Sequence, residues 1–539
     1  DGTGNNTVIL MDFSGIELRR NTSEAGIIAP SDITFSLSNP DNTLDFTAFK
    51  DGTVLVELFL WNPTYGEHKI NGWRFNIKTC EPGYQKLNFT CEDFLQDYLR
   101  GYYPNTRLPE DIFPSNRTYV GDMICIPIPF GLAYVPLRDV YITNTGYLVL
   151  GSPSYTYTIS KIRSPRSLGM KSEWDSASYS FTQSTKADAD AVNWRVFQAI
   201  IADGNNDTVV DTHGFWGTPG GPILDPPVLF SRSDTVSISN PADVIKFVLL
   251  DMGMSLTDIN TASFSTAGAV FTGWGLTFKG AFWYKQDRQK VLSLLLTMCH
   301  SCLDIGETIS LRVLSKTSKS TITGASVLRS SDQGEGSFSY QNIANEDIFV
   351  SVYIAFQEDG ESQDSLNKVL VSTGGSATTI SSDLIECPFV QDSQNVKRIG
   401  TLHYQRKLGM VANVGFLGKS LLLALQADDI ITINAANYGG SYSVLVDSIK
   451  INKDLSIQFG CTKFKQAFSD WADLTPTTFN IPVDDTTRPW SPVITGPDSP
   501  GTPIPLNAVA DRLRVGNGAA DYILIEPSVL IVVVFCSID

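Results

Sequence analysis

The chain has 539 residues, of which 42% are hydrophobic, and this size and composition are typical of a soluble protein with several packed modules. Its formal net charge of -17 and its lack of any Lys/Arg cluster argue against sequence-specific nucleic-acid binding. No apolar run reaches the roughly 18 to 20 residues that span a bilayer, and the eight Cys are too sparse for a secreted disulfide framework. We therefore expect reduced thiols and no membrane span.

The first hundred residues have the pattern of short β-strands. The segments "DITFSLSNP", "TVLVELFLWNP", "GWRFNIKTC" and "QKLNFTCEDF" alternate between apolar and polar residues and are separated by turns rich in Asn, Pro and Gly. This predicts a first tube-like β-barrel domain at residues 1–110, with a short helical stretch at 91–99. Residues 111–235 then form a β-rich connecting domain with Pro- and Gly-rich loops.

Two helices are predicted in the next part, an α+β domain at residues 236–395. In the first helix Asn240 is a suitable N-cap, Pro241 suits the first turn, apolar residues recur every three to four positions, and Gly253 ends the helix. The second helix, at 287–302, contains a dense apolar run, and we expect it to pack beneath a sheet.

Strand patterns resume after these helices. They predict a second tube-like β-barrel domain at residues 396–475, followed at 476–539 by a Pro-rich linker and a C-terminal β-hairpin extension. The predicted fold class is mainly β with some α. It comprises two small tube-type β-barrels, inserted α/β domains and the C-terminal β extension.

The two predicted barrels share an internal sequence repeat. The segment "DGTVLVELFLWN" from Asp51 resembles "DDIITINAANYG" from Asp428, and "NFTCEDFLQDY" aligns with "QFGCTKFKQAF", which pairs Cys91 with Cys461. Strand patterns with aromatic residues also recur by chance in β proteins, and chance recurrence is the alternative. We interpret the repeat as two copies of one barrel, so that a trimer would contain six similar barrels.

One loop resembles a calcium-binding loop. Oxygen-bearing side chains fall at relative positions 1, 3, 5 and 9, which are Asp203, Asn205, Asp207 and Asp211. The usual Gly at position 6 is Thr208, and no Glu stands at position 12. Such clusters also form hydrogen-bonded turns, which are the alternative to a bound Ca²⁺.

Two pairs of cysteines have suggestive spacings. Cys299 and Cys302, with His300 between them, have a spacing that suits metal or redox chemistry. The pair follows an apolar helix, so we expect buried free thiols, with a zinc site or an iron–sulphur cluster as the alternative. Cys80 and Cys91 flank a turn and could face each other, but we expect them to be reduced. Apart from these candidates, no cofactor is predicted.

No catalytic constellation is recognisable. The chain has four His and contains no HExxH, GxSxG or phosphate-binding loop motif. Acidic pairs are common, but nothing in the sequence fixes two carboxylates at a working separation. We therefore predict no catalytic residues and no enzymatic activity.

Several segments together resemble the baseplate-hub or tail-tip proteins of long-tailed bacteriophages. They are "YVGDMICIPIPFGLAYVPL", the predicted helix "ISNPADVIKFVLLDMG", the "LQADDIITI" and "YSVLVDSIKI" hairpin, and the terminal "LRVGNG". These segments are spread over most of the chain, and each motif alone is only moderately specific.

The resemblance implies a structural virion protein that is assembled in the host bacterial cytoplasm and located at the tail tip. It implies a homotrimer that closes the distal tail tube, adapts a sixfold tube to a threefold tip, and takes part in host attachment and DNA ejection. The implied partners are the distal tail protein ring, the C-terminus of the tape-measure protein, and a central tail fibre or other tail-tip proteins. DNA would pass through an acidic lumen without sequence-specific binding.

Two other functions are compatible with the sequence. A receptor-binding or carbohydrate-binding tail-tip protein would use exposed aromatic residues, and Trp61, Trp216 and Trp490 lie in suitable predicted loops. A tail-associated cell-wall hydrolase is the other alternative, although no lysozyme-like or peptidase-like region is recognisable.

The C-terminal segment is unusually apolar. Residues 527–536 contain no charged residue, and an exposed strand of this kind would be prone to aggregate. We therefore expect residues 511–539 to be buried against the same segments of two sister chains on a threefold axis.

Overall fold

The structure is a computed structural model of the chain. It describes the following residues: 10–20, 26–39, 49, 52–62, 66–104, 124–136, 138–142, 145–151, 157–166, 170–174, 179–187, 193–201, 227–232, 238–314, 317–323, 338–343, 351–356, 367–372, 382–408, 410–418, 422, 424–435, 440–452, 457–464, 471, 474, 494–495, 503–504, 524–526 and 529–531. These residues form mostly β-strands with a smaller helical part, which confirms the predicted fold class.

The chain divides into two compact units. The larger unit contains residues 1–107, 121–131 and 235–477, and the smaller one contains 108–120, 132–234 and 478–539. Both ends of the predicted connecting domain thus lie close to points where the chain passes between units. The finer division into five domains stays a prediction.

The smaller unit consists of two four-stranded antiparallel sheets and two short hairpins. One sheet has the order β10-β17-β13-β14, with β10 at Leu132–Pro136, β13 at Tyr157–Arg166, β14 at Met170–Trp174 and β17 at Pro227–Arg232. The other has the order β11-β12-β16-β15, with β11 at Arg138–Ile142, β12 at Thr145–Gly151, β15 at Tyr179–Ala187 and β16 at Asn193–Ile201. The hairpins pair β31 (Ile494–Thr495) with β32 (Pro503–Ile504), and β33 (Leu524–Glu526) with β34 (Val529–Ile531).

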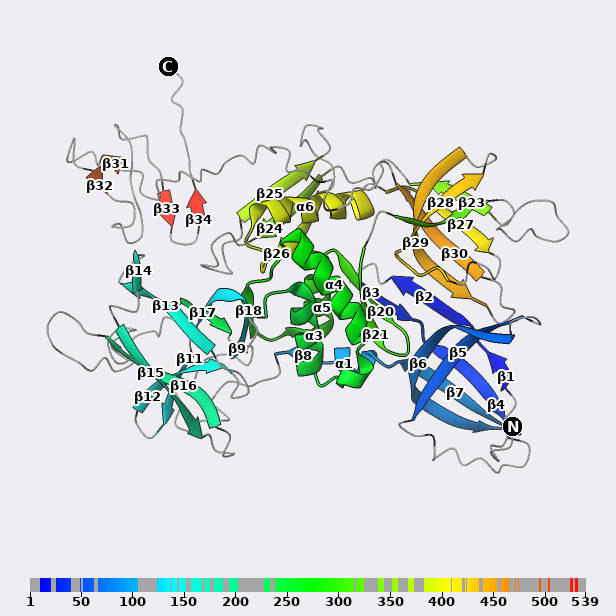
Figure 1. The fold of residues 1–539 in the computed structure, drawn as a ribbon, viewed down its shortest axis with the longest axis horizontal. Coiled ribbons are helices and arrows are strands. Elements are labelled where there is room, and N and C mark those ends of the chain that lie inside the picture. The colour runs from blue at the N-terminus through cyan, green and yellow to red at the C-terminus, as the bar shows by residue number, and fades with distance from the viewer. Residues whose placement is uncertain are drawn as a thin grey trace, which may run out of the picture. The chain divides into compact units, whose positions relative to one another are not determined.

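The first sheet of the larger unit is a curled antiparallel sheet with the order β1-β4-β7-β6-β5 (Figure 1). Its strands are β1 (Leu10–Phe13), β4 (Ile33–Ser38), β5 (Thr53–Asn62), β6 (Gly66–Gly83) and β7 (Lys86–Asp93). Along β7 the side chains alternate between half-buried and buried until the last three residues, which are all buried. This is the expected pattern for a strand with one face on a core.

The second sheet of the larger unit has ten strands. Its main path is β21-β20-β3-β2-β29-β30-β27-β23, and β28 joins β29 while β22 joins β28. The strands are β2 (Ile16–Arg20), β3 (Ile27–Pro30), β20 (Ser301–Ile305), β21 (Ile309–Val313), β22 (Ser318–Ile322), β23 (Phe338–Asn342), β27 (Met410–Gly418), β28 (Ile430–Ala435), β29 (Gly440–Ile451) and β30 (Ile457–Phe464). The N-terminal strand β2 therefore pairs with β29, from the opposite end of the unit in sequence.

Three small sheets complete the strands of the larger unit. The order β25-β24-β26 joins β24 (Ser351–Phe356), β25 (Asn367–Ser372) and β26 (Ser382–Cys387). In the other two, β9 (Ile124–Phe130) pairs with β18 (Gly280–Tyr284), and β8 (Tyr102–Tyr103) pairs with β19 (Gln286–Asp287).

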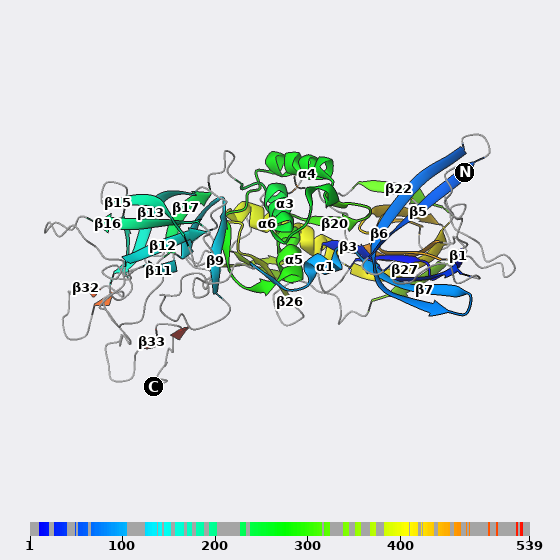
Figure 2. The ribbon, with the colours of Figure 1, turned by 90° about the horizontal axis from the view of Figure 1, so that it is seen from below.

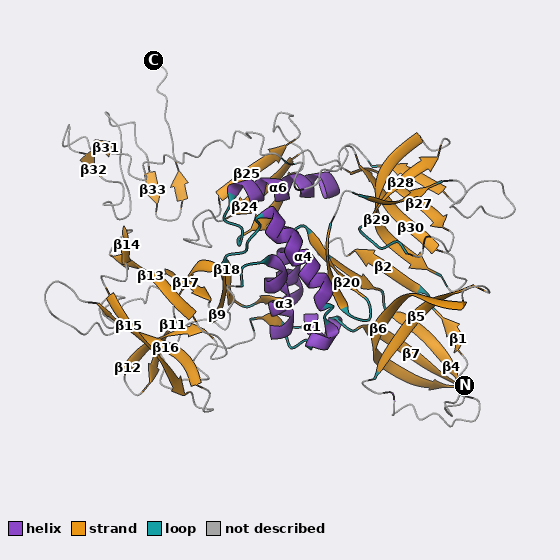
Figure 3. Ribbon diagram, in the orientation of Figure 1, coloured by secondary structure: helices purple, strands orange, loops and turns teal. Residues whose placement is uncertain are grey.

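The helices of the larger unit gather in one region (Figure 3). They are α1 (Gln96–Leu99), α3 (Pro241–Asp251), α4 (Thr261–Trp274), α5 (Arg288–Met298) and α6 (Ser393–His403), with a 3-10 turn, η2 (Leu256–Asp258), and a π turn, η4 (Tyr404–Leu408). Seen from below in Figure 2, α3, α4 and α5 lie beside β20, and α4 packs against β21. No helix in the described part of the chain is long and apolar enough to cross a membrane.

The helix starts predicted at Asn240 and Asp287 are confirmed, but the predicted end of the second helix and the predicted start at Cys91 are wrong. Asn240 accepts a hydrogen bond from the backbone N–H of Ala242 and caps α3, as predicted. The second predicted helix ends at Met298 rather than at 302, because the chain turns at His300 in a left-handed conformation and continues as β20. In the stretch 91–99, the first residues belong to strand β7 and only α1 is helical.

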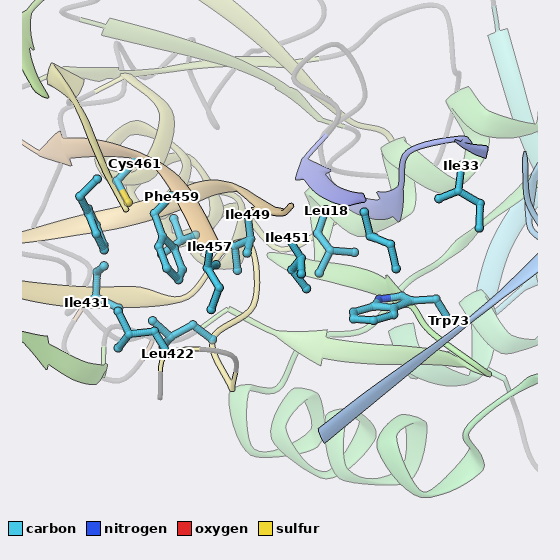
Figure 4. Close-up of a cluster of buried hydrophobic side chains, with 14 of the residues drawn as sticks. Leu18, Ile33, Trp73, Leu422, Ile431, Ile449, Ile451, Ile457, Phe459 and Cys461 are labelled. Carbon is cyan, nitrogen blue, oxygen red and sulfur yellow. The ribbon is translucent and has the colours of Figure 1, made fainter. Parts of the chain in front are cut away.

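One hydrophobic core serves both large sheets. It contains Trp73, Phe75 and Phe89 from the first sheet together with Ile431, Val446 and Phe459 from the second. Figure 4 shows Ile33 and Trp73 in the same cluster as Leu422, Ile457 and Cys461, with Leu18 and Ile451 between them. The two sheets are therefore one packed body in which each covers apolar side chains of the other.

Candidate functional site

The larger unit contains a duplicated antiparallel module. The first sheet contains the strand order β4-β7-β6-β5, and the second contains β27-β30-β29-β28. Each path contains a three-strand meander, β5–β6–β7 or β28–β29–β30. The last strand of the meander also pairs with the strand that comes before the meander in sequence, so β7 pairs with β4 and β30 pairs with β27. An outer strand extends each path next to that preceding strand, β1 in the first sheet and β23 in the second.

The pairing registers of the two modules agree residue by residue. Opposite the first strand of each path, Cys91 pairs with Ile33 and Cys461 pairs with Val414. In the meander, the corresponding pairs of the first and second module are Val54–Phe75 and Ile431–Val444, Val56–Trp73 and Ile433–Tyr442, and Ile77–Cys91 and Val446–Cys461. The predicted equivalence of Cys91 and Cys461 is confirmed, and chance recurrence does not explain it.

The modules also share a backbone irregularity. In each, the register shifts directly after the residue that faces the cysteine, between Ile77 and Thr79 in β6 and between Val446 and Ser448 in β29. Such a bulge bends a strand and increases its local twist. The bulge recurs at equivalent positions and is therefore a feature of the module itself. It accounts for the way in which each sheet curls around the core.

Stacked phenylalanines mark the same place in both modules. Phe35 and Phe89 stack with ring centroids 4.7 Å apart, and Phe416 and Phe459 stack with centroids 4.8 Å apart. Cross-strand aromatic pairs of this kind stabilise a sheet by roughly 0.2–1 kcal/mol beyond an Ala pair. The pairs therefore fix the register of the strands as well as filling the core.

A buried ion cluster ties the second module to β20 and β21, two strands of the same sheet. The guanidinium of Arg312, on β21, donates two hydrogen bonds to Asp304, at 2.7 and 3.1 Å, and one of 3.0 Å to Asp429, which directly precedes β28. The Asp429 carboxylate also accepts from the backbone N–H of Gln426. Burial raises the pKa of Asp304, and the neighbouring Arg312 opposes this shift. A planar guanidinium with several partners fixes geometry more strictly than a flexible Lys would.

A second arginine ties the first module to the same region. Arg74, on β6, donates to Asp258 at 2.9 Å, and its guanidinium carbon lies 3.8 Å from the ring centroid of Phe94. The backbone N–H of Arg74 donates to the carbonyl of Gly306, in the turn between β20 and β21. Gly72 lies beside this turn, and a Cβ there would displace the carboxylate end of the Glu307 side chain. Each module thus has its own arginine anchor: Arg74 binds η2 and the turn between β20 and β21, and Arg312 joins β21 to β20 and to the start of β28.

The cysteines of the sequence pattern are buried. Cys299 caps the end of α5, its thiol lies 2.7 Å from the Ser301 hydroxyl, and burial raises its pKa to about 12. Cys302 lies on β20, and burial raises the pKa of its thiol as well. Without a metal, thiols with raised pKa values stay protonated, as expected of buried free cysteines. Within the described ranges no three His, Cys, Asp or Glu residues form a group that could hold a metal ion. The metal or redox interpretation of this pair stays a prediction.

The other candidates are distributed as follows. Cys80 and Cys91 lie on the paired strands β6 and β7 and are both free thiols. The calcium-loop candidates Asp203, Asn205, Asp207 and Asp211 lie outside the described residues, so that site also stays a prediction.

Strand β22, at the edge of the second module, was not predicted from the sequence. This strand pairs in parallel with β28, and its last residue, Ile322, is buried in the shared core. Its sequence, SKSTI, contains a single apolar residue, which is why a strand pattern was not evident.

No protein-family model and no curated protein matches the chain. Among solved structures, it is similar to a protein in the virion of a native gene transfer agent particle, with a TM-score of 0.49 and 10% identity over 70% of this chain and 92% of that one. It is also similar to a tail protein from Neisseria meningitidis, with a TM-score of 0.38 and 6% identity over 85% and 93% of the two chains. The third, a 43 kDa prophage tail protein from Shewanella oneidensis, has a TM-score of 0.35 and 9% identity over 84% and 93%.

All three TM-scores lie below 0.5, and the matches do not by themselves assign a function to this chain. The matched structures come from virions, prophage tails and phage baseplates. The class of protein that the sequence resemblance predicted is the class to which these structures belong.

Proposed function

We propose that the chain is a structural protein of a phage-type tail, and more specifically that it forms a homotrimeric hub at the tail tip or baseplate. The duplicated module carries this proposal. Two modules with the same strand order and register in one chain give six similar modules in a trimer. A threefold assembly can then present sixfold contacts to a tube, which a chain with one module could do only as a hexamer.

The build of the modules supports a mechanical role. Their apolar residues are used in one shared core, and each module is fixed to the neighbouring strands and turns by an arginine anchor, Arg74 or Arg312. The guanidinium groups of Arg74 and Arg312 and the carboxylates that pair with them are used in these structural contacts. A rigid, closely anchored pair of modules suits a component that transmits force and seals a tube, and the proposed role needs no catalysis.

The proposed location is the virion tail, at its distal end. In this position the hub would contact the distal tail protein ring, the end of the tape-measure protein, and a central fibre or other tail-tip proteins. The net charge of -17 suits a lumen through which DNA slides, because like charges keep the duplex from adhering to the wall. Host attachment and DNA ejection would then involve this chain through its place in the tail.

The mass of the purified chain in solution tests the hub proposal. Sedimentation equilibrium should give about three times the 59.0 kDa of one chain. A symmetry determination in intact particles should place three copies around the tail axis. A monomer at assembly concentrations, together with six copies in the particle, would reject the trimer while leaving a structural tail role in place.

The C-terminal segment offers a second test of the trimer. We expect removal of residues 511–539 to weaken the trimer and leave the duplicated module folded, because the segment is apolar and separated from it by a Pro-rich linker. Sedimentation and circular dichroism would measure the two effects separately. Full-strength trimers of the truncated chain would show that the segment serves another purpose.

A further inference from the structure

The two equivalent strands β5 and β28 differ at their outer edges. In the second module, β22 lies along the edge of β28 in parallel, with Ser320 opposite Ile431 and Ile322 opposite Ile433. In the first module, β5 pairs with β6 on one side, and no strand of the described residues pairs with its other side. A strand edge of this kind presents unpaired backbone groups that can accept a further strand.

Side-chain burial differs in the same way. Ile431 and Ile433, which face β22, are both 0% exposed. Their equivalents in the first module, Val54 and Val56, are only partly buried. The next residue inward on the groove side, Trp73, is 3% exposed, so the core itself is closed and the exposure is confined to the edge strand. Among the described residues, the first module therefore has no counterpart of the strand β22 that covers the second.

The space beside β5 is a groove of about 370 Å³. Its lining is mostly apolar and includes Phe35, Val54, Val56, Trp73 and Ile451. The single charged residue in the lining is Glu57, whose carboxylate pairs with Lys69 on β6. An apolar groove next to a strand edge combines the two elements of strand addition: backbone hydrogen bonds for affinity and pockets for alternate side chains.

We propose that the outer edge of β5 and its groove dock one extended segment of another protein chain. The segment adds in parallel to β5 and places a β-branched aliphatic side chain opposite Val56, as β22 places Ile322 opposite Ile433. The inference rests on the internal comparison of the two modules, and it holds whether or not the chain is trimeric. The proposed function alone places no partner at the outer edge of β5. The inference adds a docking site there, for a partner of defined chemistry.

The chemistry of the occupant follows from β22. That strand, SKSTI, has small polar residues, one Lys and a single inward apolar residue, and it has no acidic residue. A segment of this composition is neutral or basic, and an acidic segment is the poorer fit because the mostly apolar lining of the groove would leave its carboxylates without a partner. An amphipathic helix would leave the backbone groups of β5 unpaired, and it is therefore the poorer fit.

A synthetic peptide with the sequence of residues 316–324 is the probe. Titrated against the full chain, it should bind, and the same peptide carrying Ile322→Asp should bind at least tenfold more weakly, because a carboxylate cannot enter an apolar groove without a partner. In the protein, Val56→Asp should weaken binding by a similar factor. Tyr84→Asp is the matched control, since Tyr84 is 89% exposed at the turn between β6 and β7 and should leave binding unchanged.

A photo-crosslinking group in the peptide, in place of Ser320, locates the bound strand. Crosslinks to residues 53–58 would support the proposal, whereas crosslinks to residues 430–433 would mean that the peptide only exchanges with β22 and would overturn it. Absence of binding by the unmodified peptide would also overturn it. Amide hydrogen exchange of the chain without peptide tests whether the chain covers the edge of β5 itself. Full protection of residues 53–58 without peptide would mean that it does, and would overturn the proposal.

Discussion

At the scale of single residues, Asp93 is the ionisable group with the clearest consequence. It ends β7, is 2% exposed, and accepts hydrogen bonds of 3.0 Å from the backbone N–H of Leu95 and from the side chain of Gln96. These bonds hold the start of α1. Burial nevertheless dominates and raises the pKa of Asp93 to about 6, from an ordinary value of 3.8.

This raised pKa predicts the direction of a pH effect on stability. Between the two pKa values the folded chain binds a proton that the unfolded chain does not, so the contribution to stability is fully present below about pH 4 and is lost as the pH rises through 6. Asp93→Asn is neutral at every pH. Relative to the variant, the natural chain should lose about 2 kcal/mol of unfolding free energy between pH 4.5 and 7.5.

Urea unfolding at the two pH values measures this difference. Asp97→Asn serves as the control, because Asp97 lies on the adjacent helix α1 with half of its side chain exposed. The control should follow the natural chain at both pH values. Equal pH dependence in Asp93→Asn and in the natural chain would show that the carboxyl of Asp93 is not protonated in the folded state.

At the scale of elements, the equivalent aromatic pairs stand in different surroundings. Phe416 is 2% exposed, whereas its counterpart Phe35 is only partly buried and lines the groove beside β5. The cost of removing a side chain depends on how completely its neighbours enclose it. Phe416→Ala should therefore lower the unfolding free energy by about 3–5 kcal/mol, and Phe35→Ala by clearly less.

Denaturant titrations of the two variants test this ranking. The stacking distances of the two pairs are nearly equal, so the stacking contribution cancels in the comparison and the difference reports enclosure alone. A larger loss for Phe35→Ala would mean that the groove side of the first module is closed in solution. It would also argue against the docking site proposed for β5.

The elements show which parts of this fold the sequence could predict. The repeat was visible because its spacing keeps Cys91 and Cys461 in register, and α3 was visible through its cap at Asn240 and its apolar periodicity. Helix α4 was missed because it is rich in Ser, Thr and Gly, residues that favour turns, and its buried positions are few. The pairing of β2 with β29 was missed because no local pattern encodes a partner more than four hundred residues away.

The site was predictable to a similar extent. Its duplication could be predicted, because two copies of a strand pattern are compared within one sequence. The arginine anchors could not be, since Arg74 and Arg312 meet their carboxylates only after distant segments pack. The groove exists because the two copies differ in what covers one strand edge. Such a difference depends on how distant segments pack, so it could not be predicted from the sequence.

At the scale of the whole molecule, the shared core changes what the duplication means. Two separate barrels would each have an interior of their own and could unfold independently. Here the buried side chains of both modules form one cluster, with Ile16 and Leu18 of β2 packed among residues of either sheet. Elements that share a core open together, so the two modules are expected to be one cooperative unit.

A cavity made in one module should therefore weaken both. Ile33 is fully buried on β4, and Figure 4 shows it at the opposite end of the core cluster from Cys461 of β30. Ile33→Ala should cost about 2–5 kcal/mol, and amide hydrogen exchange should accelerate by the same factor in β7 and in β30, because both exchange through the same opening. Strands β15 and β16, which belong to the smaller unit, are the internal control and should keep their protection. If exchange accelerated in β7 while β30 kept its protection, the modules would be independent barrels that merely touch, and rigid coupling of the pair could not be part of the hub's role.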